Sequence, residues 1–367
     1  MNLVKNIKII CLFILMAIIL WNPTETCRYA FEGLTQWSTR MVPTLFPFMV
    51  LSSLMIYSGA DKQLGKILSY ILKPFLKLTD YGIYAATMGF LCGFPMGAKV
   101  VSELYISCKI TAKEAQLLIA FCNNIGPAYF LGLILPILNI LGYHSTIPFL
   151  FGMYGIPFLY GVLLSYRYMN ENKIPVTQQN TKTECINSST AELLSKVCMD
   201  NIQAILLLGG YVTFINAFRV IFDCLPMTHN MASVLGCFLE IISGIPNIYS
   251  SGLMAASKMF WIMSCLSFNG ISCMIQAGSF LEKAKLPVGH YIFHKLILTG
   301  ISMAVAISLI VTILENLNGF IRTDENIIKM AKTFKATKYQ ILTKIVITPS
   351  ADDQGWYVDQ VSPLSIE

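Results

Sequence analysis

The sequence has 367 residues, of which 55% are apolar and 13% charged, and its mean hydropathy is +0.62. A soluble domain usually carries about a quarter charged residues, so this composition excludes an ordinary water-soluble fold. The formal charge of +6 comes from basic residues between apolar windows, which indicates membrane topology signals rather than a nucleic-acid-binding surface. The 11 cysteines include no Cys-x-x-Cys pair, which favours buried apolar side chains over disulfides or a zinc site.

The N-terminal segment predicts a membrane anchor. Residues 9–21 are apolar and follow Lys5 and Lys8, which is the arrangement of a signal sequence. Because no small-x-small cleavage site comes directly after them, we expect an uncleaved anchor over residues 1–22 with its N-terminus in the cytoplasm. A cleaved signal peptide is the alternative.

Five further segments complete the first half of the chain. Residues 41–60 are an uncharged span, and residues 61–80 carry four lysines, which predicts an amphipathic helix on the cytoplasmic surface. Residues 81–98 are uncharged but end in glycines and a proline, which predicts a re-entrant half-helix rather than a complete span. Two more apolar windows follow at 115–142 and 145–166.

A polar stretch over residues 167–196 divides the chain and predicts a flexible cytoplasmic linker. The second half repeats the order of the first, with a span, an interrupted pair of windows, a window and a last span at 200–222, 231–257, 259–281 and 291–314. We therefore expect two transporter repeats, residues 23–166 and 197–318. Residues 319–367 form a polar tail that lacks the apolar length for another span.

Two short motifs recur in the same order in both halves. Gly93-Phe94-Pro95 corresponds to Gly244-Ile245-Pro246, at an offset of 151 (244 minus 93), and Asn123 corresponds to Asn269, at an offset of 146 (269 minus 123). If both Gly-x-Pro elements are re-entrant, the expected cytoplasmic segments hold 15 lysines and arginines, and the opposite face, which includes residues 22–40, holds three. The two halves then enter the membrane in opposite orientations, as in the inverted repeats of secondary transporters.

The first candidate site is a broken helix end made of Gly93, Phe94, Pro95 and Gly97. A helix broken within the membrane presents free backbone N–H groups at a positive helix end, which suits an anion. Lys99 and Glu103 follow at i and i+4 and share a helix face. We expect Lys99 to contact a substrate carboxylate, or Glu103 a cation. The alternative is an interfacial ion pair between the two.

Polar side chains inside apolar windows make up the second candidate site, and they are Asn123, Asn124, Asn269 and Gln276. Each amide would be costly in lipid unless it faced a polar cavity or another helix. We expect substrate or ion coordination, with interhelical hydrogen bonding as the alternative. Glu240, close to Ser243 and Gly244, is predicted to carry a proton or bind a cation. The alternative is that Glu240 lies at the mouth of the hairpin, in contact with water.

No catalytic machinery is visible in the sequence. Phosphate-binding loops, nucleophile elbows and paired catalytic carboxylates are absent. His290 and His294 have the i, i+4 spacing of zinc ligands but no third ligand nearby. We therefore predict neither enzymatic activity nor a metal or other cofactor.

Four stretches carry a resemblance to a known family: LFPFMVLSSLM at 45–55, GFPMGAKVVSELY at 93–105, CNNIGPAYFLG at 122–132 and LEIISGI at 239–245. They resemble the YlbJ-type sporulation integral membrane proteins of spore-forming Firmicutes. These in turn are similar to the Gate-domain group, which includes concentrative nucleoside transporters. The resemblance covers residues 5–318 and implies a transporter in the outer forespore membrane that moves dipicolinic acid toward the spore.

We therefore expect an all-α polytopic membrane protein with about eight hydrophobic helices and two re-entrant hairpins in an inverted repeat, which transports a small anionic solute. One alternative is a non-transporting assembly protein of the sporulation membranes. A nucleoside permease is another, and an ABC-type permease is a third, since residues 325–349 resemble the coupling loop of such permeases. The expected partners are the lipid bilayer and a small-molecule substrate, without nucleic acid, and self-association into a homo-oligomer is left open.

Overall fold

The computed structural model describes residues 2–143, 146–170, 190–306 and 308, and these residues form helices without any strand. The chain divides into two compact units, Met1–Leu309 and Ile310–Glu367. All the described residues belong to the first unit. The predicted tail over residues 319–367 lies outside the described residues, as do residues 171–189 of the predicted linker. Helices extend into both ends of that linker, up to residue 170 and from residue 190.

The first long element is a continuous helix over Pro23–Ser58. It consists of α2 (Pro23–Gln36), a π-helical turn η1 (Trp37–Met41) and α3 (Val42–Ser58), and it follows α1 (Asn2–Trp21). Pro23 lies in the first turn, where its fixed φ suits a helix start, and Gly59 ends the helix with a φ of +76°. The span expected at residues 41–60 therefore begins too late in the prediction, because the helix already begins at Pro23.

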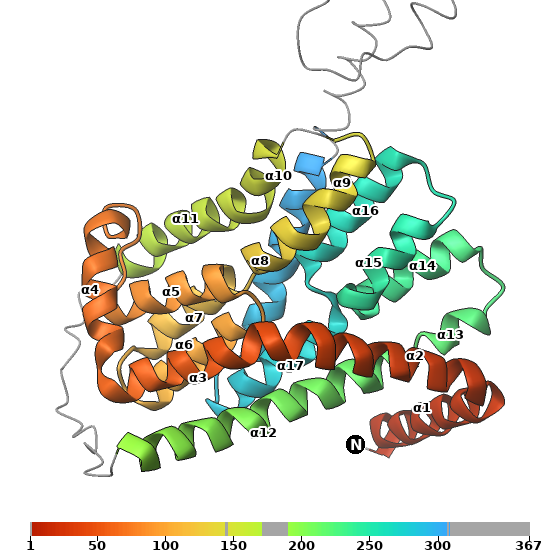
Figure 1. Ribbon diagram of the computed structural model, residues 1–367, viewed down its shortest axis with the longest axis horizontal. Helices are drawn as coiled ribbons and strands as arrows, with labels where there is room; N and C mark the ends of the chain where they lie inside the picture. The colour runs from red at the N-terminus through yellow and green to blue at the C-terminus, as the bar shows by residue number, and fades with distance from the viewer. Residues whose placement is uncertain (1, 144–145, 171–189, 307, 309–367) are drawn as a thin grey trace, which may run out of the picture. The chain divides into compact units, whose positions relative to one another are not determined.

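The second long element, α12 (Thr190–Ala217), runs antiparallel beside the first (Figure 1). The indole Nε1 of Trp37 donates to the Ile205 carbonyl at 2.9 Å. The ring of Trp37 lies over Gly209, where an added methyl group would come within 2.5 Å of the ring. A glycine at this position therefore lets an aromatic side chain pack directly on the backbone, which is how small residues join helices in membranes.

Helix α4 (Ala60–Leu72) is amphipathic, as predicted for residues 61–80. Its small and polar residues face inward, and its large apolar residues Ile67, Tyr70 and Ile71 are exposed. Gly65 allows the closest approach to α5 (Asp80–Cys92), since an added methyl group would lie 2.0 Å from the Asp80 carbonyl oxygen. The apolar face of α4 is therefore directed away from the protein, as in a helix at a membrane surface.

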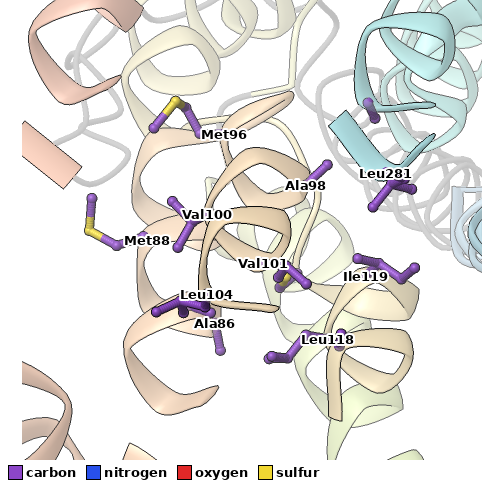
Figure 2. Close-up of a cluster of buried hydrophobic side chains, with 14 of the residues drawn as sticks. Ala86, Met88, Met96, Ala98, Val100, Val101, Leu104, Leu118, Ile119 and Leu281 are labelled. Atoms are coloured by element: carbon purple, nitrogen blue, oxygen red, sulfur yellow. The ribbon is translucent and has the colours of Figure 1, made fainter. Parts of the chain in front are cut away.

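Helices α5 and α6 (Met96–Ile106) form a hairpin, with a tight turn at residues 93–95. Figure 2 shows how its buried side chains meet those of α7 (Ala112–Phe121) and α17 (Gly270–Lys283). The labelled residues are Ala86 and Met88 of α5, Met96, Ala98, Val100, Val101 and Leu104 of α6, Leu118 and Ile119 of α7, and Leu281 of α17. Alanines and glycines between larger side chains bring the helices close, so dispersion contacts hold the hairpin.

A short non-helical stretch interrupts the helix after α7. The chain resumes in α8 (Pro127–Tyr129), η2 (Phe130–Ile134) and α9 (Leu135–Ile140). It then returns through α10 (Ile147–Leu150), η3 (Phe151–Gly155) and α11 (Ile156–Asn170).

The second half follows the same order after α12 and the short α13 (Val220–Asp223). Helices α14 (His229–Leu239) and α15 (Ile241–Ser250) form a second hairpin, and α16 (Ala255–Phe268) leads through Asn269 into α17. The last described helix is Val288–Ala306. Figure 1 shows α14 and α15 side by side.

The predicted break at Gly244-Ile245-Pro246 was misplaced. The hairpin turns at Glu240, where φ and ψ are −143° and 117°, and Pro246 lies inside α15. The carboxylate of Glu240 caps the N-terminus of α15, so the helix begins before the Gly-x-Pro sequence is reached. Gly244 serves packing instead, since an added methyl group would lie 2.3 Å from the Cys237 α-carbon on α14.

Five helices in the described part of the chain are long and apolar enough to cross a bilayer, namely Pro23–Ser58, Ile147–Arg167, Ala191–Asp223, Ala255–Lys283 and Val288–Ala306. The expected count of eight is not reached by this criterion of length and composition. Two shorter apolar helices, Leu12–Trp21 and Pro127–Ile140, add to them. The protein is thus an integral membrane protein whose described part is all-helical.

Candidate functional site

Four interruptions lie at the middle of four helical segments. Gly93 is the midpoint of α5–α6 (80–106), and Gly126 is the midpoint of α7–α9 (112–140). Asn269 is likewise the midpoint of α16–α17 (255–283). Glu240 lies directly beside the midpoint of α14–α15 (229–250). Each segment therefore places non-helical backbone halfway along its length.

The interruptions contact one another in pairs. A methyl group added at Gly93, whose φ is +82°, would lie 2.4 Å from the Gly126 amide nitrogen. A methyl group added at Gly270, whose φ is +69°, would lie 2.9 Å from the side chain of Ile241. The tip of each hairpin thus packs on the interruption in the next segment of the same half, through glycines that leave no room for a side chain.

The amide of Asn269 joins the two halves. Its Nδ2 donates to the backbone carbonyl of Asn123 at 2.9 Å. Asn123 follows the last turn of α7 and so has a carbonyl that no helical N–H occupies. The side chain of Asn124 donates to the Phe121 carbonyl at 2.6 Å and so caps the end of α7. The structure therefore brings together the three asparagines predicted as a site.

Lys295 completes this asparagine cluster, although the sequence pattern did not single it out. Its ammonium donates to the Asn123 carbonyl at 2.9 Å and to Asn124 Oδ1 at 3.1 Å, and the residue is only 3% exposed. Tyr291, one turn earlier on the same helix, accepts from Asn123 Nδ2 at 3.0 Å. The sequence did contain a signal for Lys295, because it is a lone charged residue inside the apolar window 291–314. Glu240 was predicted as a site residue on the same ground.

Several amide oxygens in and near this cluster have no hydrogen-bond partner. They are Oδ1 of Asn123, Oδ1 of Asn269 and Oε1 of Gln276, and all three residues are buried. The other end of the Gln276 amide donates to Ser272 on the same helix at 3.0 Å. A buried acceptor without a partner usually costs about 1–3 kcal/mol, so these oxygens are available for a ligand with hydrogen-bond donors or a positive charge.

Lys99 and Glu103 lie in a separate cluster. The two side chains form an ion pair, with Lys99 4% and Glu103 32% exposed. Lys99 also donates to Ser53 of α3 at 2.8 Å, and Asn201 of α12 donates to the same hydroxyl at 3.3 Å. The geometry is that of the predicted ion-pair alternative, which here fastens α6 to both long helices. Substrate binding by Lys99 stays a prediction.

Glu240 and Ser243 form a third cluster, at the second hairpin. The Glu240 carboxylate accepts from the backbone N–H groups of Ile242 and Ser243 at 3.1 and 2.8 Å, and from the Ser243 hydroxyl at 2.7 Å. The same hydroxyl lies 2.8 Å from Asn216 Oδ1 of α12. Arg219 reaches Asn216 Oδ1 at 3.3 Å and Glu32 at 2.9 Å. Glu240 is fully buried rather than placed in a water-filled mouth.

The two histidines take part in helix contacts. His294 Nδ1 lies 2.6 Å from the Tyr160 hydroxyl, and His290 Nε2 lies 3.2 Å from the Gln116 carbonyl. Within the described ranges, no three His, Cys, Asp or Glu side chains are grouped as metal ligands.

Comparison with known proteins gives one significant similarity. The chain is 21% identical over 352 residues to the sporulation integral membrane protein YlbJ of Bacillus subtilis (strain 168), and the alignment covers 84% of each chain. This confirms the predicted resemblance to the YlbJ-type proteins. No protein-family model matches the chain, and no solved structure matches it.

Proposed function

We propose that the protein is a membrane transporter for a small anionic solute. The observation that carries this proposal is the meeting of helix interruptions halfway along their segments. In a bilayer, backbone that is not helical is tolerated only where protein or a water-filled cavity surrounds it. Discontinuous helices that meet near the bilayer midplane are the usual binding sites of secondary transporters.

The positions of the interruptions also support an inverted repeat. With the second hairpin turn at Glu240, the offset between Gly93 and Glu240 is 147 (240 minus 93), close to the offset of 146 between Asn123 and Asn269 (269 minus 123). The offset of 151 between the Gly-x-Pro motifs differs from 146 by five residues, whereas the offset between Gly93 and Glu240 differs from it by one. Threonine caps begin both hairpins, at Thr79 and Thr228.

We propose dipicolinate as the solute and the outer forespore membrane as the location. The name of the relative describes a sporulation integral membrane protein. Dipicolinate is a small aromatic dicarboxylate, and it suits a site with a buried ammonium and amide groups. A nucleoside, the solute of the similar Gate-domain transporters, would not need the ammonium.

The test is uptake into proteoliposomes that contain the purified full-length protein. We expect labelled dipicolinate to accumulate faster than in protein-free liposomes, and labelled uridine not to do so. Uptake of uridine alone would transfer the assignment to a nucleoside permease. If the folded protein moves neither compound, the transporter assignment fails, and the assembly protein of the sporulation membranes takes its place.

A further inference from the structure

We propose that Lys295 binds the anionic group of the solute and thereby sets the charge that the site accepts. This inference rests on the proposed transport function and deepens it. It assigns the role to a lysine of the last described helix, in place of Lys99, which the sequence pattern had favoured.

Lys295 differs from the other buried cations in the described part of the chain. Lys99 pairs with Glu103, and Arg219 pairs with Glu32 at 2.9 Å. No ion pair among the described residues includes Lys295, whose two hydrogen-bond acceptors are a backbone carbonyl and an amide oxygen. Its ammonium is therefore buried against neutral groups only.

This arrangement costs free energy unless another charge enters. Burying an ammonium without a counter-ion is among the most expensive placements in a protein. The ammonium has three N–H donors, and its bonds to Asn123 and Asn124 leave one for a ligand. A solute carboxylate next to Lys295 would supply the missing charge and accept the remaining N–H.

The surrounding groups supply no such charge themselves. The ionisable neighbours on the packed elements are the buried thiols of Cys122, after α7, and Cys273, on α17. Tyr291 is on the same helix as Lys295 and contacts Asn123. The free oxygens of Asn123 and Asn269 are hydrogen-bond acceptors and supply no positive charge for an anion. Lys295 is therefore the group of this cluster that can pair with a carboxylate of the solute.

A purely structural lysine is the rival explanation. Its bonds to Asn123 and Asn124 would then fasten the last described helix to the interruption after α7. The two explanations predict opposite effects on stability. Removing a structural lysine destabilises the protein, whereas removing an uncompensated buried charge leaves stability unchanged or raises it.

The experiment compares purified full-length wild type with Lys295→Met, Lys295→Arg and the double variant Lys99→Met/Glu103→Gln. Affinity is measured for dipicolinate and for its uncharged dimethyl ester, and the unfolding temperature is measured without either compound. The exposed Lys113→Met serves as the surface control. The ratio of the two affinities reports charge selection, which a structural role alone would not change.

We expect Lys295→Met to lower the ratio of dipicolinate to ester affinity on the order of a hundredfold, the usual scale for losing one partner of a buried charge pair. Lys295→Arg should keep a preference for the anion, and Lys295→Met should unfold at the same or a higher temperature than wild type. An unchanged ratio, a clear fall in unfolding temperature, or loss of the preference only in the Lys99/Glu103 double variant would overturn the proposal.

Failure of the transport proposal would be recognised separately. If wild type binds neither dipicolinate nor the ester, the proposed solute is wrong. The unfolding temperatures still decide the state of Lys295, because a more stable Lys295→Met variant supports an unpaired buried charge and a less stable one contradicts it.

Discussion

Single residues decide how closely the interruptions meet. Gly93 has a φ of +82°, a region that L side chains rarely adopt, and its α-carbon lies against the backbone of Gly126. The sequence predicted that this glycine breaks a helix, but it could not show which backbone lies opposite, because that contact joins two separate helical segments.

We expect Gly93→Ala to destabilise the protein by about 2–4 kcal/mol, since strain at positive φ adds to overpacking against Gly126. Thermal unfolding in detergent measures the change. Gly132→Ala is the matched control, because an added methyl group there meets nothing within 4 Å. Equal unfolding temperatures for the two variants would contradict the contact.

The asparagines and the lysine show what residue patterns reveal. Asn123, Asn124 and Asn269 could be predicted because amides are rare in apolar windows. Lys295 directly follows His294, and the i, i+4 spacing of His290 and His294 was the more evident pattern in that segment. The i, i+4 spacing of Lys99 and Glu103 correctly indicated a shared face, but their partner Ser53, and Asn201, which donates to Ser53, come from distant helices.

At the scale of elements, a buried ion pair fastens α4 to the turn after α6. Asp61 is fully buried, and Lys109, whose side chain is 11% exposed, lies 2.7 Å from its carboxylate. The same ammonium donates to the Ile56 carbonyl at the end of α3 at 2.6 Å. One lysine therefore holds the ends of three elements together.

Replacing Lys109 by methionine should destabilise the protein by about 3–5 kcal/mol, because Asp61 would stay buried without its counter-charge. The double variant Asp61→Asn/Lys109→Met should recover most of that loss. The unfolding temperatures of both variants are the measurement. A double variant as unstable as the single one would show that the charge is not the cause.

The hairpin of α14 and α15 depends on Gly244 in a different way. Alanine favours a helix more than glycine by about 1 kcal/mol, yet Gly244 packs on the backbone of Cys237. We expect Gly244→Ala to unfold at a lower temperature than wild type, and Gly210→Ala, with open space around it in α12, to match or exceed wild type. A stabilised Gly244→Ala would mean that the two helices are further apart.

At the scale of the whole molecule, side-chain contacts join residues near the ends of helices into two groups. One group includes Lys109 with Asp61 and Lys77 with the Tyr166 ring. The other includes Tyr29 with Asp223 at 3.2 Å and Asn230 with Gly252 at 2.9 Å. We expect these groups to lie at the cytoplasmic face and the opposite face predicted from the lysines and arginines.

Exposed native cysteines can test this topology, since Cys108 lies in the first group while Cys27 and Cys224 lie in the second. In intact cells of a host that carries the protein in its plasma membrane, a membrane-impermeant maleimide should label Cys27 and Cys224, and Cys108 should react only after permeabilisation. Peptide mapping by mass spectrometry measures the labelling, with serine variants at each position as controls. Labelling of Cys108 and Cys27 together in intact cells would refute the arrangement.

The order of the elements could be predicted from the sequence, but the exact positions of the turns between them could not. Apolar windows and charge bias indicated the order of elements in each half. The glycine and proline of residues 244–246 suggested the wrong position for the turn of the second hairpin. The chain turns earlier, at Glu240, whose carboxylate caps the N-terminus of α15. Both Glu240 and the Gly-x-Pro sequence at residues 244–246 are local signals for a turn. The packing of Gly244 on α14 shows that the turn forms at Glu240.

The continuous helix over Pro23–Ser58 has a consequence for the surrounding lipid. Its 36 residues extend about 54 Å at about 1.5 Å per residue, whereas the hydrocarbon core of a bilayer is about 30 Å thick. The helix must therefore tilt or project beyond the core, and α12, joined to it at Trp37, must follow. The acyl chain length of the lipid should thus change the orientation of the helices, because a thinner bilayer favours a greater tilt of both long helices and of the hairpins packed against them.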